Sequence, residues 1–314
     1  MINLIEKYRK EIFKYLFEIN SFSQSWSNSW KSQILNIFQN KNVSEDSLIK
    51  LGENLRNIFL STSSGSRNQS EVSTAGTGWE SLLAWYLNLG LIGTRTIVIK
   101  PKKEFNFECI QKTITVNYGE FISNSESDLI AITFPKENEV AYPVEELKKY
   151  EGKIFSINDL EILEDGSLKT LNQYLNKIIE NNISKIEINV IQCKTNWNDN
   201  AQIPMGWDII YSSTGFTKGD IKIGKDGFSI HKIKDFKYSF ITVPTQKDLE
   251  KIKENSTQVL RVKNLSGGNF WGTITKENVA KSIGEIFKDN FNESYSKVKF
   301  DDRIKNVELN DIGL

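Results

Sequence analysis

The sequence predicts an α/β fold with a mixed central β-sheet flanked by helices. Its 314 residues are 39% hydrophobic and 11% aromatic, which is enough apolar material for a sizeable core. Charged residues make up 25%, the usual level in a folded globular protein. Strand-like and helix-like apolar spacings alternate through the middle of the chain, as is typical of a sheet covered by helices. These observations exclude a disordered or fibrous chain.

The N-terminal region is predicted to be helical, because apolar residues recur every three or four positions within residues 1–60. Residues 61–78 are mostly Ser, Thr, Gly and Asn, which predicts a long loop. That loop is either a linker or a flexible arm that contacts a ligand. A strong helix is expected from Trp79, with Thr77 as its N-cap and Glu80 at the capping-box position.

Runs of β-branched residues predict the strands of the sheet. The strand at 185–194 has a nearly apolar middle, which indicates a central strand covered on both faces. A hairpin is predicted over 221–230, with Asp226 and Gly227 in its turn. The other predicted strands are 94–101, 112–118, 127–135, the short segment 152–157, 237–244 and 256–265. The later helices are predicted at 167–182, 202–213, 245–255 and 276–291.

The composition removes several common kinds of catalytic site. Two cysteines, Cys109 and Cys193, cannot supply a disulfide framework or a cysteine zinc site. The single histidine, His231, excludes any site that needs two imidazoles. No P-loop, GxGxxG or GxSxG motif stands in its required context. Carboxylates, lysines and hydroxyls remain as possible catalytic groups.

The net charge of zero removes a bulk attraction to nucleic acid, but it allows a local basic face. Residues 120–166 hold twelve acids against four lysines, whereas residues 218–237 hold six lysines against three aspartates. The alternative is a solvated surface with no special role. The sequence shows no signal peptide and no apolar run near the roughly 20 residues of a membrane span, so a cytoplasmic protein is expected.

An acid and a lysine occupy the ends of two predicted strands. Asp128 opens one strand and Lys194 ends another. Gln192 lies two residues before Lys194 and is expected on the same face, whereas Cys193 is expected in the core. A Mg²⁺ ion held by carboxylates neutralises charge at a phosphate and activates water, and a nearby ammonium can position that water. These residue types therefore suit the hydrolysis of phosphodiesters.

The combination of Asp128, Gln192-x-Lys194 and a carboxylate at Glu80 resembles the PD-(D/E)xK nuclease superfamily, and within it the type II restriction endonucleases. The segment IQCKTNWNDNAQIPMGWDIIYSS is also similar to restriction enzymes of this superfamily. The resemblance implies Mg²⁺-dependent, sequence-specific cleavage of double-stranded DNA that leaves 5′-phosphates. It implies that Asp128, Glu80 and the Gln192 oxygen hold the metal. Lys194 would position, or help to deprotonate, the attacking water.

The resemblance also implies partners and a division of the chain. A palindromic target calls for a homodimer, and a separate DNA methyltransferase would protect the host without stable binding. Residues 1–60 would form an N-terminal helical region. Residues 61–245 would form a restriction-endonuclease-like catalytic core with an inserted segment at 136–184. Residues 246–314 would form a C-terminal α/β part that contributes DNA contacts.

Two departures from the superfamily pattern leave alternatives open. Gln192 stands where the superfamily usually has Asp or Glu, and an amide oxygen brings no charge to a metal. The gap between Asp128 and Gln192 is long, and Asp159 and Asp165 within it are rival acidic ligands. The structural alternatives are a turn acid at Asp128, a solvated strand end at Lys194 and a capping acid at Glu80.

Side chains able to read DNA are expected beside the site, because Asn and Gln pair with adenine and Asp accepts from cytosine. The candidates after the catalytic strand, together with one arginine from the earlier loop, are Asn196, Trp197, Asn198, Asp199, Gln202 and Arg67. A second patch offers Asn264, Ser266 and Asn269 around a glycine pair. The lysines of 218–237 suit phosphate contacts. The alternatives are an Asn-rich loop anchored by Trp197 and a plain glycine turn.

Two further functions remain open. One is a repair or RNA nuclease of the same superfamily. The other is a catalytically inactive DNA-binding protein, with Gln192 as the inactivating change.

Overall fold

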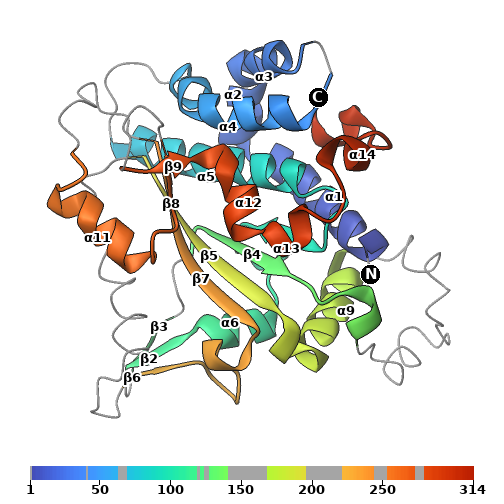
Figure 1. The fold of residues 1–314 in the computed structure, drawn as a ribbon, viewed down its shortest axis with the longest axis vertical. Coiled ribbons are helices and arrows are strands. Elements are labelled where there is room, and N and C mark those ends of the chain that lie inside the picture. The colour runs from blue at the N-terminus through green and yellow to red at the C-terminus, as the bar shows by residue number, and fades with distance from the viewer. Residues whose placement is uncertain are drawn as a thin grey trace.

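The computed structural model confirms the α/β fold with a mixed central sheet (Figure 1). It describes residues 2–39, 42–62, 69–118, 121–123, 127–140, 168–195, 221–243, 253–272 and 279–314. The helix predicted at 202–213 and the short strand predicted at 152–157 lie outside the described residues, as do residues 245–252 of the helix predicted at 245–255, and residues 253–255 are not helical. Among the described residues, no helix has the length and apolar character needed to cross a membrane.

The central sheet has six strands in the order β1-β4-β5-β7-β8-β9. The first three are antiparallel neighbours, and from β5 onward each strand runs parallel to the next. The strand β5 is buried along nearly all of its length, as the apolar run predicted. The strands are β1 (Thr96–Ile99), β4 (Leu129–Thr133), β5 (Glu187–Lys194), β7 (Asp235–Thr242), β8 (Phe270–Gly272) and β9 (Lys281–Ser282).

A smaller antiparallel sheet has the order β3-β2-β6, and Figure 1 places it on the far side of the molecule from α2–α4. Its strands are β2 (Val116–Tyr118), β3 (Phe121–Ser123) and β6 (Ile221–Ile223). The predicted hairpin over 221–230 was wrong. The turn at Asp226 and Gly227 is present, with positive φ at both residues, but β6 pairs with β2. A local turn signal fixes the bend of the chain and not the partner of the strand.

The long helix α5 lies between the N-terminal helices and the sheet (Figure 1). Residues 81–90 of this helix are all buried and almost all apolar, as expected of a helix with neighbours on every side. The helices of this layer are α1 (Ile2–Glu18), α2 (Asn20–Ser25), α3 (Lys31–Ile37), α4 (Glu45–Leu60) and α5 (Gln69–Gly90), and a π-helical turn at Trp26–Trp30 joins α2 to α3.

The remaining helices are α6 (Glu108–Ile114), α9 (Leu168–Asn181), α11 (Thr257–Leu265), α12 (Ile286–Asn290), α13 (Asn292–Tyr295) and α14 (Phe300–Ile304). Among them, α9 packs against α1 and α6, and α12 contacts α5 through Phe287 and Tyr86. Short 3₁₀ turns occur at Glu137–Glu139, Ile183–Lys185, Ile230–Lys232, Ile283–Glu285 and Leu309–Ile312. The predicted helix at 167–182 is confirmed as α9. The strand predicted at 112–118 is strand only from Val116 and helix before it.

The start of α5 corrects the prediction for the Ser- and Thr-rich segment. Thr77 and Glu80 lie inside the helix, so Thr77 is not an N-cap and Glu80 is not a capping-box acid. The Ser81 hydroxyl donates to the Thr77 carbonyl at 2.7 Å, one turn back, which satisfies the hydroxyl within the helix. Burial of the following residues outweighs the low helix propensity of Ser, Thr and Gly.

The segment 256–265 corrects another prediction, since it forms α11 and not a strand. Its buried side chains, Val259, Val262 and Leu265, are three residues apart, and that spacing belongs to one helix face. Their β-branched character had suggested a strand. The helix predicted at 276–291 is likewise shorter, because β9 and a 3₁₀ turn precede α12.

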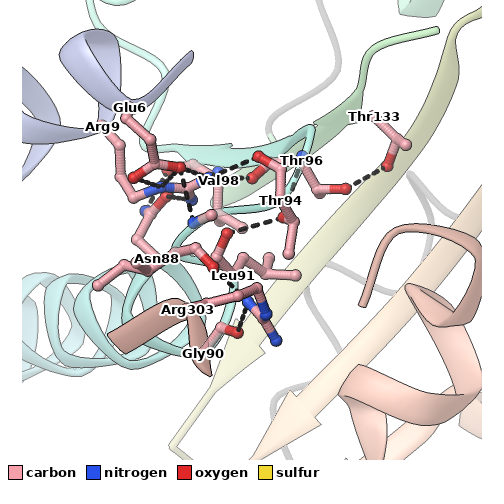
Figure 2. Close-up of polar contacts among 12 residues, drawn as sticks. Glu6, Arg9, Asn88, Gly90, Leu91, Thr94, Thr96, Val98, Thr133 and Arg303 are labelled. Carbon is pink, nitrogen blue, oxygen red and sulfur yellow. Dashed lines mark hydrogen bonds and ion pairs between the residues drawn. The ribbon is translucent and has the colours of Figure 1, made fainter. Parts of the chain in front are cut away.

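A buried polar network fixes the connection between α5 and β1 (Figure 2). Arg9 is 1% exposed, and its guanidinium donates to the Thr94 and Thr96 carbonyls at 3.2 and 2.8 Å. It also donates to the Asn88 side chain at 3.1 Å, and Asn88 in turn accepts from the Val98 N–H at 3.1 Å. The N-terminal helix α1 is thereby tied to the first strand of the central sheet.

Candidate active site

The candidate site lies where β4 begins and β5 ends. Leu129 is opposite Ile191, so one further step of the antiparallel register places Asp128 opposite Gln192. Residues opposite each other in such a pair share a face, and Lys194, two residues beyond Gln192, shares it too. The three residues that the sequence singled out therefore belong to one face of the sheet at one end.

The Asp128 carboxylate makes two contacts with the end of β5. Its Oδ2 atom accepts from the Cys193 N–H at 2.7 Å and forms an ion pair with Lys194 Nζ at 3.5 Å. The Asp128 and Lys194 side chains are only 18% and 11% exposed. Because a backbone donor holds it, the carboxylate is part of the β4–β5 connection and not a solvated turn acid.

The electrostatic surroundings of Asp128 act in opposite directions. Burial raises the pKa of this carboxyl above its usual value, and the negative charge of Glu80 raises it further. Lys194 and the Cys193 N–H oppose this rise by stabilising the ionised form. The influence of Glu80 places a second carboxylate near Asp128, although the two acids come from different elements.

Glu80 extends from α5 and pairs with a lysine that sequence reasoning missed. Its Oε2 atom lies 2.6 Å from Lys100 Nζ, and Lys100 also approaches the Thr77 carbonyl at 3.5 Å. The Glu80 and Lys100 side chains are 22% and 16% exposed, so the pair is largely shielded from solvent. Lys100 directly follows β1, and a lysine after a buried apolar strand was the one signal that could have marked it.

The charges of the Asp128–Lys194 and Glu80–Lys100 pairs all act on the Cys193 thiol. Burial raises the pKa of this thiol, the charges of Asp128 and Glu80 raise it further, and those of Lys194 and Lys100 lower it. Cys193 is therefore a core thiol and not a thiolate nucleophile. These two ion pairs, the charged cluster, hold two carboxylates and two ammonium groups, whose charges cancel when all four are ionised.

Gln192 is 4% exposed and so lies deeper than Asp128 and Lys194, the two other candidates on its face of the sheet. It shares a hydrogen bond with the Tyr238 side chain on β7, which lowers the tyrosine pKa. Burial has the larger effect and raises the pKa of Tyr238, and the charge of Asp128 adds to that rise. The amide thus joins β5 to β7 directly behind Asp128.

The donor set suits a hard divalent cation held by few protein ligands. Both contacts of Asp128 use Oδ2, so Oδ1 accepts no hydrogen bond from the described residues. Among all the residues that the structure describes, no group of three His, Cys, Asp or Glu side chains is placed to hold a metal ion. Mg²⁺ commonly binds through one or two carboxylates and completes its shell with water and phosphate. Asp128 and Glu80 match that pattern.

The residues predicted to read DNA are described only in part. The two alternative acidic ligands and most of the residues predicted to contact DNA bases lie outside the described residues. They are Asp159, Asp165, Arg67, Asn196, Trp197, Asn198, Asp199 and Gln202. Asn264 is exposed on α11, and Asn269 is half-buried before β8. Ser266 is 3% exposed and its hydroxyl donates to the Lys263 carbonyl at 3.4 Å, so its orientation does not suit the reading of a base edge.

The predicted lysine-rich surface is divided between free and paired side chains. Lys222 and Lys225 are exposed near β6, where they can approach a phosphate. Lys234 instead pairs with Glu187 and Glu293, each at 2.7 Å. His231 is exposed on a 3₁₀ turn, away from the charged cluster on β5.

Comparison with known proteins gives no match: no protein-family model matches the chain, and no curated protein is significantly similar to it. A functional proposal therefore has to rest on the geometry around Asp128 and on the residues of the sequence pattern.

Proposed function

We propose that this protein is a metal-dependent endonuclease that hydrolyses phosphodiester bonds of double-stranded DNA, with the site specificity of a type II restriction enzyme. One observation carries the proposal. Asp128 is held by the β5 backbone and by Lys194, beside a second carboxylate–lysine pair, at the end of buried strands. The sequence resemblance adds the expected substrate, because the same acid and lysine belong to the PD-(D/E)xK pattern.

Asp128 and Glu80 would hold the divalent cation. When bound, Mg²⁺ neutralises negative charge on a phosphate and lowers the pKa of a coordinated water. The neutral cluster of two acids and two lysines becomes positive when such an ion is added, and that charge complements a phosphodiester and a hydroxide. Gln192 lies behind Asp128 with a neutral oxygen, so the two carboxylates would carry the charge of the ligand set.

The chain's own residues would fix the reacting groups. The Cys193 N–H donates to Asp128 Oδ2 and so fixes the orientation of the whole carboxylate through the backbone of β5. The Oδ1 atom is therefore positioned by that backbone contact and not by a flexible side chain. Lys194 Nζ can donate to an attacking water or to a developing phosphate oxyanion while it remains near Asp128. Lys100 Nζ would hold Glu80 and add a second positive charge.

Specific recognition would come from side chains around this end of the sheet. Asn264 and Asn269 are the described candidates, and the Asn-rich segment after Lys194 supplies the others. A palindromic target would bring two copies of the chain together as a homodimer on double-stranded DNA. A separate methyltransferase would then protect the host sequence.

The direct test is cleavage of unmethylated phage and plasmid DNA with Mg²⁺ or with EDTA, read on a gel. Lys194→Ala should lower the rate at least about 100-fold. Lys169→Ala, at an exposed position on α9, is the matched control and should cut like the wild type. Discrete fragments that require Mg²⁺ support restriction cleavage. A smear, or cleavage of RNA alone, would move the function to a repair or RNA nuclease.

One observation favours a second candidate, a DNA-binding protein without catalysis. The position usually held by an acid in the superfamily is Gln192, and only two carboxylates meet among the described site residues. This candidate predicts retained DNA binding and no cutting with any divalent metal. Gln192→Glu should then create cleavage, whereas in an active nuclease the same change should leave the requirement for Lys194 intact.

A further inference from the structure

A second concave site lies at the other end of β1 and β4. Lys100 follows β1 and Asp128 precedes β4 at the candidate active site, whereas Arg95 and Lys136 lie at the opposite ends of the same strands. The pocket there has a volume of about 540 Å³ and is also lined by α13 and α14 residues. From Arg95 to Lys100 the chain advances roughly 16 Å at the rise of a strand.

Arg303 is a half-buried cation of this pocket, and Arg95 is buried. Its guanidinium donates to the carbonyls of Gly90 (3.1 Å) and Ile92, and its Nε donates to the Val298 carbonyl at 3.0 Å. Figure 2 shows the contact with Gly90, at the end of α5. Across the described part of the chain, no carboxylate forms an ion pair with Arg303. Burial lowers the pKa of this guanidinium to about 10.

Arg95 is also weakly compensated. It donates to the Phe134 carbonyl, and its single carboxylate contact is Glu293 at 3.5 Å. Glu293 lies closer to Lys234, at 2.7 Å, and that lysine is the main cause of the lowered pKa of Glu293. The carboxylate is therefore committed to Lys234, and Arg95 retains most of its capacity to bind an anion.

Two lysines complete the positive lining. Lys136 lies 3.9 Å from Glu139, at the limit of an ion pair, and Lys297 is exposed with no ion pair to the residues that the structure describes. Glu137 is the one acid among the lining residues, against two arginines and two lysines. A concave surface with this excess of positive charge raises the local concentration of anions.

We propose that this pocket binds a small phosphate-bearing molecule, of about the size of a mononucleotide. Arg303 Nη2 and Arg95 Nε make no hydrogen bond within the described part of the chain, and guanidinium N–H groups donate well to phosphate oxygens. The volume lies in the range of small-molecule sites, and Pro135 and Val298 give it apolar walls for the rest of a ligand. Its concave shape favours a small ligand over the backbone of a duplex. An anion would also offset the cost of the poorly compensated Arg303.

The test is calorimetric titration of the full chain with AMP and with inorganic phosphate. An Asp128→Asn background and EDTA remove binding at the other site. Saturable binding should weaken at least tenfold in Lys136→Gln/Lys297→Gln, whose side chains are exposed and whose loss should not affect folding. Lys299→Gln/Lys305→Gln is the matched control, with the same loss of charge at exposed positions outside the pocket, and should bind like the parent.

Equal affinity for AMP and phosphate would identify the phosphate as the whole ligand, and tighter AMP binding would show that the apolar walls contribute. No saturable binding at millimolar ligand would overturn the proposal, as would an equal loss in both double variants. Displacement of AMP by short duplex DNA, with the same dependence on Lys136 and Lys297, would also overturn it and assign the pocket to the DNA backbone.

Discussion

The two ends of strands β1 and β4 handle charge in opposite ways. At the Asp128 end, each carboxylate meets a lysine, at 2.6 Å for Glu80–Lys100 and at 3.5 Å for Asp128–Lys194. At the other end, Arg303 is bound by backbone carbonyls and aromatic rings, with the Tyr295 ring 4.9 Å away. One end balances its charges internally, whereas the other retains positive charge.

This difference indicates what each end can bind. A neutral cluster that contains two acids can accept a cation without a large electrostatic penalty, and it becomes attractive to a phosphodiester only after doing so. An uncompensated cluster of cations attracts an anion directly. On the two proposals, the same two strands would present a site for a metal and its substrate at one end and a site for a small anion at the other.

The largest expected effect comes from neutralising Asp128. Asp128→Asn should lower the single-turnover cleavage rate at least about 100-fold, because it removes a charged metal ligand. The variant should nevertheless be more stable than the wild type at pH 7, since it removes a buried charge while an amide oxygen still accepts from Cys193 N–H. Asp235→Asn, at an exposed carboxylate, is the control for both measurements. A fully active Asp128→Asn enzyme would contradict the assignment of this site.

The pH dependence of that stability difference has a definite sign. Burial and Glu80 raise the pKa of Asp128 in the folded state above that of the unfolded chain. The folded state therefore loses stability as the pH rises through the folded pKa, and below the unfolded pKa no loss remains. Denaturant unfolding of wild type and Asp128→Asn should show a gap that is small in acid and largest near neutrality. A gap that widens toward acid would contradict the raised pKa.

The next effect is structural and concerns the opposite end. Arg303→Met should destabilise the protein by about 2–4 kcal/mol, because the part-buried Gly90 and Ile92 carbonyls and the exposed Val298 carbonyl lose their donor. Lys305→Met, two residues away and exposed, should leave the unfolding midpoint unchanged. If Arg303→Met were neutral, the carbonyl contacts would not account for the burial of this guanidinium.

Ligands should stabilise the two ends independently. At a Mg²⁺ concentration tenfold above its dissociation constant, the folded state should gain about 1.4 kcal/mol, and Glu80→Gln should reduce that gain. AMP should stabilise Glu80→Gln as much as it stabilises the wild type, since contributions from distant sites add. Thermal unfolding with each ligand and with both tests this, and loss of the AMP effect in Glu80→Gln would place both ligands at one site.

The smallest predicted effect concerns Lys100. Lys100→Met should lower the Mg²⁺ concentration for half-maximal stabilisation by about threefold, because an ammonium that competes for Glu80 is removed. Lys102→Met is the control, with a side chain exposed beyond the same strand. An unchanged Mg²⁺ requirement would mean that Glu80 keeps its lysine when metal binds and is not itself a ligand.

The sequence was sufficient to predict the elements whose signal is local. The apolar run of β5, the strand β4 and the helix α9 were predicted correctly, because burial on both faces or on one helix face is visible in the spacing of side chains. The strand predicted over α11 failed because β-branched residues at helical spacing suit either structure. The start of α5 failed because packing outweighed a Ser- and Thr-rich composition.

The site was predictable only where one strand carries it. Gln192 and Lys194 are two residues apart, so their shared face follows from the strand alone. Lys100 is twenty residues from Glu80, and their pairing depends on how α5 packs against β1. No local sequence pattern encodes the pairing of Lys100 with Glu80. The interpretation of Glu80 as a capping acid is corrected for the same reason.

The hydrogen bond from Cys193 N–H to Asp128 has a consequence for how activity arises and is lost. It joins residues 65 positions apart, and it forms only when β4 and β5 have paired. Closing such a loop is slow and cooperative, so contacts of this kind appear late in folding. On the proposed function, a nascent chain would have no cutting centre until β5 has been synthesised and docked. On heating, cleavage and sheet structure should disappear together, because the centre cannot survive the opening of that one strand pair.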